Sequence, residues 1–301
     1  MILLDIFIAI LPALLWGAGP LLATLVGGKP IQQVTGTCYG QFVIGVVLYL
    51  VYGMIFGMPA ITFKLLFWPL LGGILWAVAQ LMQFTSFKQL SVSIAMPIST
   101  GLQVIEIPLL GVIFWGEWYM PHAKLYGFIS IAVLIIGICL TSYKQNASSN
   151  KKLDYKGGLT MLIVGSFGYT ACSIFPKISD AHTFSQTIVL CLGQNIGMCL
   201  GAAVMAAFIQ HKAHFNVLTA KVSFKNMIVG LLGGIGILCY LYALSKLGPA
   251  TAFPLTQMNV LVSTLGGIFI LHEHKTYKEM AFILIGLVLI LGAATVIAQL
   301  K

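Results

Sequence analysis

The stretch Phe-Lys-Gln-Leu-Ser-Val-Ser-Ile-Ala-Met-Pro at residues 87–97 has a distant copy, Leu-Ser-Lys-Leu-Gly-Pro-Ala-Thr-Ala-Phe-Pro, at residues 244–254. The final prolines of the two stretches lie 157 residues apart. Each stretch is followed by an apolar run that ends in a glutamate, and these glutamates, Glu117 and Glu273, lie 156 residues apart. The chain therefore reads as two related halves. A duplicated apolar chain is typical of secondary transporters, whose substrate site lies between the repeats.

The composition places this chain in a membrane. Of its 301 residues, 59% are hydrophobic and only 8% are charged, and the mean hydropathy is +1.00, whereas a soluble domain carries about 25% charged residues. The net charge of +9 comes entirely from lysine, and the sequence contains no arginine. A bidentate arginine clamp on phosphate or carboxylate therefore cannot be built, which weighs against a phosphorylated substrate.

Ten apolar runs are long enough to cross a bilayer core as helices. We expect the first run to be a retained span and not a cleaved signal peptide. The runs cover residues 3–26, 31–56, 65–87, 91–115, 122–143, 157–176, 185–209, 226–246, 249–271 and 279–299.

The polar stretch 144–156 separates five spans from five. The sequence thus predicts an all-α integral membrane protein with a first repeat at 1–143, a linker at 144–156 and a second repeat at 157–301. An odd number of spans in each half makes the second half enter the membrane from the opposite side, so the repeats are predicted to be inverted. Matching Gly-Gln pairs (Gly40-Gln41 and Gly193-Gln194) and Gly-Gly pairs (Gly72-Gly73 and Gly233-Gly234) occur in the same order in both halves.

The lysines predict the orientation. Connections that follow odd-numbered spans hold eleven lysines, and the other side holds five. The positive-inside rule then places the 144–156 linker in the cytoplasm and both termini outside the cell membrane. We read the positive charge as a topology signal and not as a nucleic-acid surface.

Uncharged polar and aromatic residues within the spans are the candidates for substrate binding. Trp76, Gln80 and Gln83 share one helix face by their spacing, and amides supply both donors and acceptors. An aromatic plane beside amides suits a small neutral sugar, although interhelical packing explains any single residue as well. The full candidate set is Trp16, Gln41, Trp76, Gln80, Gln83, Thr100, Gln103, Gln194, Asn195, Tyr240, Gln257 and Asn259.

Backbone features within the spans form a second group of candidates. Pro97 and Pro254 are expected to kink their helices and free carbonyl groups toward a cavity. The small-residue stripes Gly36-x3-Gly40 and Gly193-x3-Gly197-x3-Gly201 allow close helix approach. They indicate simple tight packing, a pseudo-symmetric contact between the second and seventh spans, or a sliding surface.

Acidic residues are few. Glu106 lies well inside a span, where a carboxylate is by default a candidate proton or cation site, although a protonated structural glutamate fits equally well. Asp5 and Asp180, near span ends, are further candidates for proton coupling. Glu117 and Glu273 end the fourth and ninth spans, and we favour a structural contact for both over a substrate contact.

Enzyme and metal chemistry find no support in the sequence. It contains no Gly-x-Ser-x-Gly, P-loop or His-Glu-x-x-His pattern, and His272 and His274 point apart on a helix, which disfavours a metal site. The six cysteines lie in apolar runs without a Cys-x-x-Cys pair, as expected of core residues. We predict neither a catalytic residue nor a cofactor.

Several runs resemble the bacterial glucose/ribose uptake family, in the ten-helix branch of the drug/metabolite transporter superfamily. They are Leu-Pro-Ala-Leu-Leu-Trp-Gly at 11–17, Gly-Gly-Lys-Pro at 27–30, Ala-Met-Pro-Ile-Ser-Thr-Gly at 95–101, Val-Ile-Phe-Trp-Gly-Glu-Trp at 112–118 and Ser-Thr-Leu-Gly-Gly-Ile-Phe-Ile-Leu at 263–271. The resemblance spans nearly the whole chain. It implies sugar import across the plasma membrane, coupled to protons, and it assigns no individual residue.

The sequence is therefore interpreted as a carrier that imports a monosaccharide by proton symport with alternating access. A drug or metabolite exporter of the same fold, which Glu106→Gln would impair, is the first alternative. A sugar sensor that binds without net flux is the second. The sugar, the stoichiometry and the oligomeric state are not fixed by the sequence.

Overall fold

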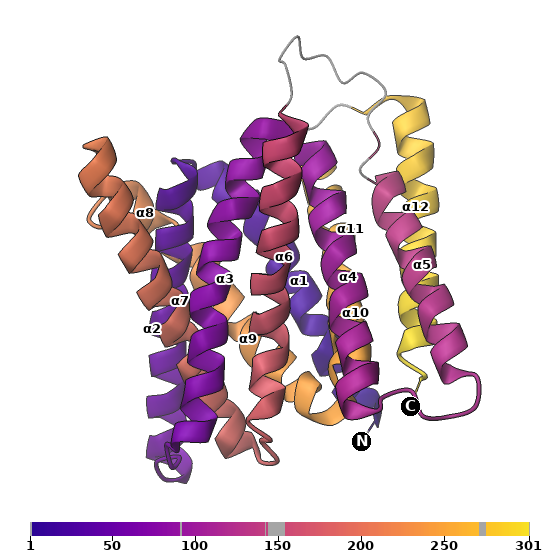
Figure 1. The fold of residues 1–301 in the computed structure, drawn as a ribbon, viewed down its shortest axis with the longest axis horizontal. Coiled ribbons are helices and arrows are strands. Elements are labelled where there is room, and N and C mark those ends of the chain that lie inside the picture. The colour runs from indigo at the N-terminus through magenta and orange to yellow at the C-terminus, as the bar shows by residue number, and fades with distance from the viewer. Residues whose placement is uncertain (1, 91, 142, 144–153, 271–274, 301) are drawn as a thin grey trace.

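The computed structural model of this chain describes residues 2–90, 92–141, 143, 154–270 and 275–300. Within these ranges the chain forms helices and no strands, and ten segments are long and apolar enough to cross a membrane. The predicted all-α class and the ten spans are thereby confirmed. The helices, drawn in Figure 1, are α1 (Ile2–Val26), α2 (Pro30–Phe56), α3 (Phe63–Leu90), α4 (Val92–Trp115), α5 (Ala123–Thr141), α6 (Tyr155–Ile178), α7 (Phe184–Ala213), α8 (Lys221–Lys225), α9 (Met227–Leu247), α10 (Pro249–Thr256), α11 (Asn259–Phe269) and α12 (Tyr277–Ile297).

Connections and polar caps set the ends of these helices. Thr183 and Thr276 each form a capping box, and the Asp154 carboxylate accepts a hydrogen bond from the Gly157 N–H. These side chains satisfy backbone donors that have no partner within the helix. The first residues of α1 and the last of α12 lie at the same end of the bundle, and the α1–α2 connection lies at the opposite end (Figure 1).

The ninth span is broken and the fourth is not. α10 ends at Thr256, a turn follows at Gln257 and Met258, and α11 begins at Asn259. The Gln257 N–H donates to the carbonyl of Pro254 at 3.1 Å, so the chain tightens into a turn directly after the proline. α4, in contrast, runs as continuous helix through Pro97.

Contacts between the two halves come in related pairs. α3 packs on α6 and α7, while α9, its counterpart in the order of spans, packs on α1 and α2. α4 contacts α6 as α11 contacts α1, and α2 contacts α7, α5 contacts α12 and α4 contacts α10. α5 and α12 stand together at the side of the bundle (Figure 1). Exchanging the halves maps this set of contacts onto itself, although the inversion of the repeats stays a prediction.

The matched glycine and glutamine positions meet in these contacts. A Cβ placed on Gly73 in α3 would strike the backbone of Gln194 in α7, and Gly234 in α9 lies against Gln41 in α2. The predicted glycine stripes pack closely, but they do not face each other. Gly40 in α2 lies against Gly230 in α9, and Gly197 in α7 lies against Leu70 in α3. The stripes therefore pack tightly without a pseudo-symmetric contact to each other, and a sliding surface stays a prediction.

The close contact between α2 and α9 should be sensitive to a single methyl group. A Cβ on Gly230 would overlap the carbonyl oxygen of Thr37, which is backbone and cannot move aside. We expect Gly230→Ala to lower the melting temperature in detergent, with a free-energy cost of about 1–3 kcal/mol for overpacking. Gly292→Ala is the matched control, because nothing lies within 4 Å of a Cβ there. Equal melting temperatures for the two variants would contradict this account of the packing.

Candidate functional site

A cavity of about 600 Å³ lies between the two halves, lined by every span except α5 and α12. This volume is typical of small-molecule sites. Eleven of the twelve predicted substrate-binding residues line it, although their role in binding stays a prediction. They are Trp16, Gln41, Trp76, Gln80, Gln83, Thr100, Gln103, Gln194, Tyr240, Gln257 and Asn259.

Asn195 is the predicted residue that does not line the cavity. It is fully buried, and its amide nitrogen lies 3.3 Å from the Cys191 sulfur. A Cβ on Gly45 of α2 would touch its side chain. The Asn195 amide therefore packs at the contact between α7 and α2. This position fits interhelical packing, the alternative to substrate binding that was considered for each polar residue in the spans.

Aromatic rings form two apolar surfaces of the cavity. On one, the Tyr240 ring lies 5.9 Å from Trp16 and 6.3 Å from Phe253, centroid to centroid. On the other, the rings of Trp76 and Tyr169 meet edge to face at 6.4 Å. The Trp16 Nε1–H donates to the Gly233 carbonyl at 3.2 Å and fixes its ring. Flat rings held in this way can pack against the apolar face of a ligand.

Gln83 is the centre of a polar network on the cavity wall. Its carbonyl oxygen accepts from the Tyr169 hydroxyl at 3.0 Å and from the Gln80 amide at 3.3 Å. Its amide nitrogen donates to the Ser99 hydroxyl at 2.7 Å, and Gln103 also donates to that oxygen, at 3.2 Å. The network ties α3, α4 and α6 together, so it positions the polar side of the cavity as a unit.

Two glutamines of the cavity lining carry buried oxygens without a partner. Gln41 Oε1 and Gln194 Oε1 accept no hydrogen bond from any described residue, and both side chains line the cavity. The Gln194 amide nitrogen is occupied, at 3.3 Å from the Cys172 carbonyl oxygen. Because a buried acceptor without a partner costs free energy, each oxygen is suited to accept from a ligand hydroxyl or a water.

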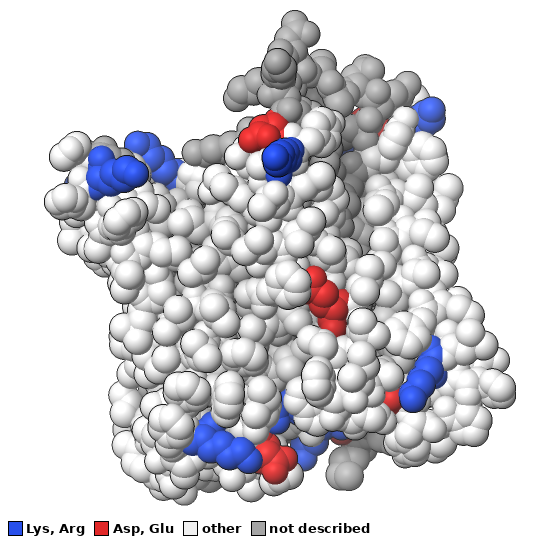
Figure 2. All heavy atoms as spheres, in the orientation of Figure 1, with Lys and Arg blue, Asp and Glu red and all other residues white. Residues whose placement is uncertain are grey.

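The cavity lining is uncharged. It includes no Asp, Glu, Lys or His among the described residues. Figure 2 shows charged atoms concentrated toward the two ends of the molecule, with an acidic group at mid-height between α6 and α4. The site therefore offers hydrogen bonds and apolar contact but no ion pair.

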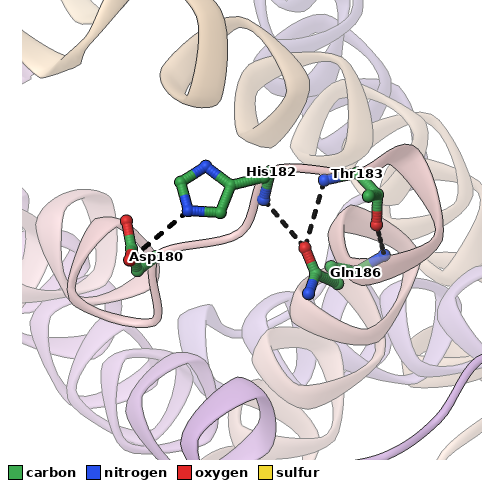
Figure 3. A network of polar contacts seen from close by, with 4 residues as sticks. All are labelled: Asp180, His182, Thr183 and Gln186. Carbon is green, nitrogen blue, oxygen red and sulfur yellow. Dashed lines mark hydrogen bonds and ion pairs between the residues drawn. The ribbon is translucent and has the colours of Figure 1, made fainter.

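The predicted proton-coupling residues all lie outside the cavity lining. Glu106 is held between α4 and α6, where its two oxygens accept from Ser166 at 2.7 Å and Thr170 at 2.6 Å. Asp5 accepts from the Tyr242 hydroxyl at 3.1 Å. Asp180 is 67% exposed and lies 3.4 Å from His182 in the α6–α7 connection (Figure 3). A role for any of them in coupling stays a prediction.

The cavity reaches toward one end of the bundle. Its lining extends along α1 to the exposed Thr24 and along α2 to Pro30, at the α1–α2 connection. At the opposite end, the end of α4 packs on the start of α10. The Glu117 carboxylate accepts from the Ala250 N–H at 2.8 Å, and the Trp118 Nε1–H donates to Thr251 at 3.2 Å. Trp118 is 1% exposed, so its ring is packed within this contact.

Several lining residues were not among the predicted site residues. Gln33 and Thr37 continue the face of Gln41 at spacings of four, a polar stripe that helical periodicity could have identified. Tyr169 and Ser173 on α6 show the same spacing. Ser173 contributes a carbonyl that accepts from the Tyr240 hydroxyl at 3.2 Å, and no sequence pattern indicates such a contact.

In the part of the chain that the structure describes, no three His, Cys, Asp or Glu side chains lie close enough together to hold a metal ion. The six cysteines are free. His272, Glu273 and His274 lie outside the described residues, so the pairing of Glu273 with Glu117 rests on sequence alone.

Comparisons with known proteins agree with one another. The family described as "Sugar transport protein" matches residues 7–300. A putative sugar uptake protein of Listeria monocytogenes is 35% identical over 99% of this chain and 100% of its own. A putative ribose uptake protein of Latilactobacillus sakei (35% identical) and a probable glucose uptake protein of Staphylococcus aureus (36%) each match over 99% of both chains. A crystal structure with 16% identity aligns with a TM-score of 0.66 over 98% of both chains, and it shares the fold.

The Gln83 network should matter to stability as well as to shape. Gln83→Ala leaves the Tyr169 hydroxyl and the Ser99 hydroxyl without their partner, so we expect a loss of about 1–3 kcal/mol, read as a lower melting temperature in detergent. Gln80→Ala is the matched control, because it removes a single hydrogen bond of 3.3 Å. An equal or larger loss for the control would show that the network is not centred on Gln83.

Proposed function

We propose that this chain, which belongs to the sugar transport protein family, is a carrier that takes a small neutral sugar, glucose or ribose, into the cell. The family match carries the proposal, since relatives of the same length are named for uptake of these sugars and none of those compared is named as an enzyme. The cavity supplies the chemistry. It combines two aromatic surfaces, several amides and no charge.

A pyranose or furanose ring matches this lining. Its C–H faces are apolar and can pack on the rings of Trp16 and Trp76. Its hydroxyls both donate and accept, so they can meet the unpartnered oxygens of Gln41 and Gln194 and the amides around Gln83. A neutral cavity of this kind does not suit a cationic drug, which would need an acidic partner in a site that excludes water.

The orientation follows from the lysines. The 144–156 linker lies in the cytoplasm and both termini lie outside, so the open end of the cavity faces the cytoplasm and the α4–α10 contact closes the outer end. The two halves, 1–143 and 157–301, act as inverted repeats around the cavity. Support comes from the inter-half contacts, which map onto themselves when the halves are exchanged.

Transport proceeds by alternating access and is driven by proton symport. In this scheme the present conformation is the inward-open state, and rocking of the halves opens the outer end while closing the inner one. The glycine stripes, which pack on neighbouring helices at backbone distance, are the proposed sliding surfaces for this motion. A sugar sensor of the same fold would bind sugar and show no flux.

The test is exchange of labelled sugar in proteoliposomes. Vesicles loaded with unlabelled glucose or ribose should take up external labelled sugar transiently, because a carrier exchanges substrate without any ion gradient. Exchange of neither sugar by folded protein would refute the proposal. Binding of sugar without exchange would favour the sensor.

Substrate selection should follow charge. Because the lining offers no counter-ion, transfer of an ammonium or carboxylate into the cavity costs free energy that hydrogen bonds do not return. We expect unlabelled glucose or ribose to compete for uptake of its labelled form, and protonated glucosamine and gluconate to compete at least about tenfold more weakly, a difference of 1.4 kcal/mol. Equal inhibition by a charged analogue would contradict the assignment of a neutral substrate.

The aromatic surface can be tested with a pair of tryptophans on α3. Trp76 lines the cavity, whereas Trp68 packs edge to face on Phe175 away from it. Trp76→Ala should raise the KM for sugar exchange about tenfold, because loss of ring stacking is worth about 0.5–1.5 kcal/mol beyond the buried area. Trp68→Ala should leave the KM near the native value. The opposite ranking would place the sugar elsewhere.

A further inference from the structure

Glu117 lies at the contact between the end of α4 and the start of α10, which the proposed orientation places at the outer end of the protein. Its Oε2 accepts from the Ala250 N–H at 2.8 Å. Gly248, with φ of +75°, comes so close that a Cβ there would overlap the Glu117 carboxylate. Only glycine fits both this backbone conformation and this space. The chain is therefore shaped locally around the Glu117 side chain.

The other oxygen of this carboxylate is buried without a partner. Glu117 Oε1 accepts no hydrogen bond from any described residue. A carboxylate oxygen in that position is costly, whereas a protonated oxygen needs less solvation. Glu106 is the contrasting acid, since both of its oxygens accept from hydroxyls.

Neighbours of Glu117 line two cavities. Tyr240 on α9, which lines the main cavity, is close enough to interact electrostatically with the Glu117 charge. Lys177 on α6 also interacts with Glu117 and lines a smaller cavity of about 180 Å³ together with Asp180 and His182. Asp180 and His182 are 67% and 76% exposed. Ionisable side chains near Glu117 thus belong to both the main cavity and the smaller one.

The remaining neighbours carry little charge. α10 has no ionisable side chain between Pro249 and Thr256, and the Glu117 connection itself contains Tyr119 and His122. Burial raises the pKa of Glu117 to about 7, against the opposing effects of the Ala250 N–H and the Lys177 charge. The carboxyl is therefore poised to gain or lose a proton near neutral pH.

We infer that Glu117 carries the coupling proton, and that its neutral form is the one that closes the outer end. The inference rests on the proposed sugar symport. With the outer end open, water solvates the carboxylate, which takes up a proton from outside. Closure buries the neutral carboxyl against α10 while the sugar faces the cytoplasm. Loss of the proton to the cytoplasm leaves a buried carboxylate, which favours return to the outward-open state.

The pKa of Glu117 determines how pH affects closure of the outer end. A carboxyl with a higher pKa in the closed state than in water binds its proton more tightly there, so protonation favours closure. For Glu117 this contribution is fully present below its ordinary pKa of 4.5 and is lost as the pH rises through the raised pKa of about 7. A lower pH outside than inside therefore drives the cycle inward.

The experiment compares sugar exchange with proton-driven accumulation in the same proteoliposomes. A pH difference of one unit, acid outside, supports at most about tenfold accumulation for one proton per sugar. We expect Glu117→Gln to exchange sugar within about twofold of the native rate and to accumulate none, because the amide fixes the neutral form. Glu106→Gln is the matched control and should keep both activities. Accumulation by Glu117→Gln at the native level would overturn the inference.

A conservative variant separates coupling from folding. Glu117→Asp keeps an acid but shortens its reach to Ala250, so accumulation should persist with a shifted pH profile. If Glu117→Gln fails to exchange, this shift still supports the inference, and an unchanged pH profile for Glu117→Asp overturns it.

The proton site can also be tested without sugar transport. If native protein exchanges neither glucose nor ribose, emission from the adjacent, buried Trp118 tests the proton site directly. Subtraction of a Trp118→Phe spectrum should reveal a pH transition near the pKa of about 7. Glu117→Gln should abolish it, and Glu106→Gln should retain it. A flat titration of the native protein would overturn the inference.

Discussion

The exclusion of water from the bilayer core is the constraint on which this structure depends. Every backbone group there must be satisfied within the protein, so the spans are helical. Polar side chains face the same requirement and have only two solutions. Glu106 takes the first, since both of its oxygens accept from hydroxyl groups on the neighbouring α6. Gln41, Gln83 and Gln194 take the second and line a shared cavity. Polar side chains that line the cavity thus remain able to form hydrogen bonds with a ligand.

Close helix contact sets the shape of that cavity. Glycines let α2 approach α9 and let α3 approach α7 at backbone distance. α5 and α12 contribute nothing to the lining and pack on each other instead, with Gly137 against Gly286. The cavity is consequently formed by the eight remaining spans. Loss of a single glycine contact would change how closely two of these helices approach and so change the shape of the cavity.

Periodicity and composition predicted most of the fold and many of the cavity residues. Ten runs of sufficient length became ten spans, and the spacing of Trp76, Gln80 and Gln83 put three lining residues on one face. The contacts that the sequence did not predict join residues that only the folded chain brings together. Nothing in the sequence tells that Glu106 meets Ser166 and Thr170 on α6, or which helix each glycine stripe meets. A structural contact was favoured for Glu117, but its partner Ala250 could not be named because it lies 133 residues away.

The difference between the matched fourth and ninth spans is itself evidence about mechanism. Both contain a proline at the same place in the duplicated stretch, yet α4 is continuous through Pro97 while the ninth span breaks at Gln257 and Met258. Two distantly related sequences thus adopt unlike conformations in one molecule, and the broken span is the one whose first helix, α10, meets the end of α4. In a carrier of inverted repeats, exchange of these two conformations between the halves would move the opening from one end of the cavity to the other.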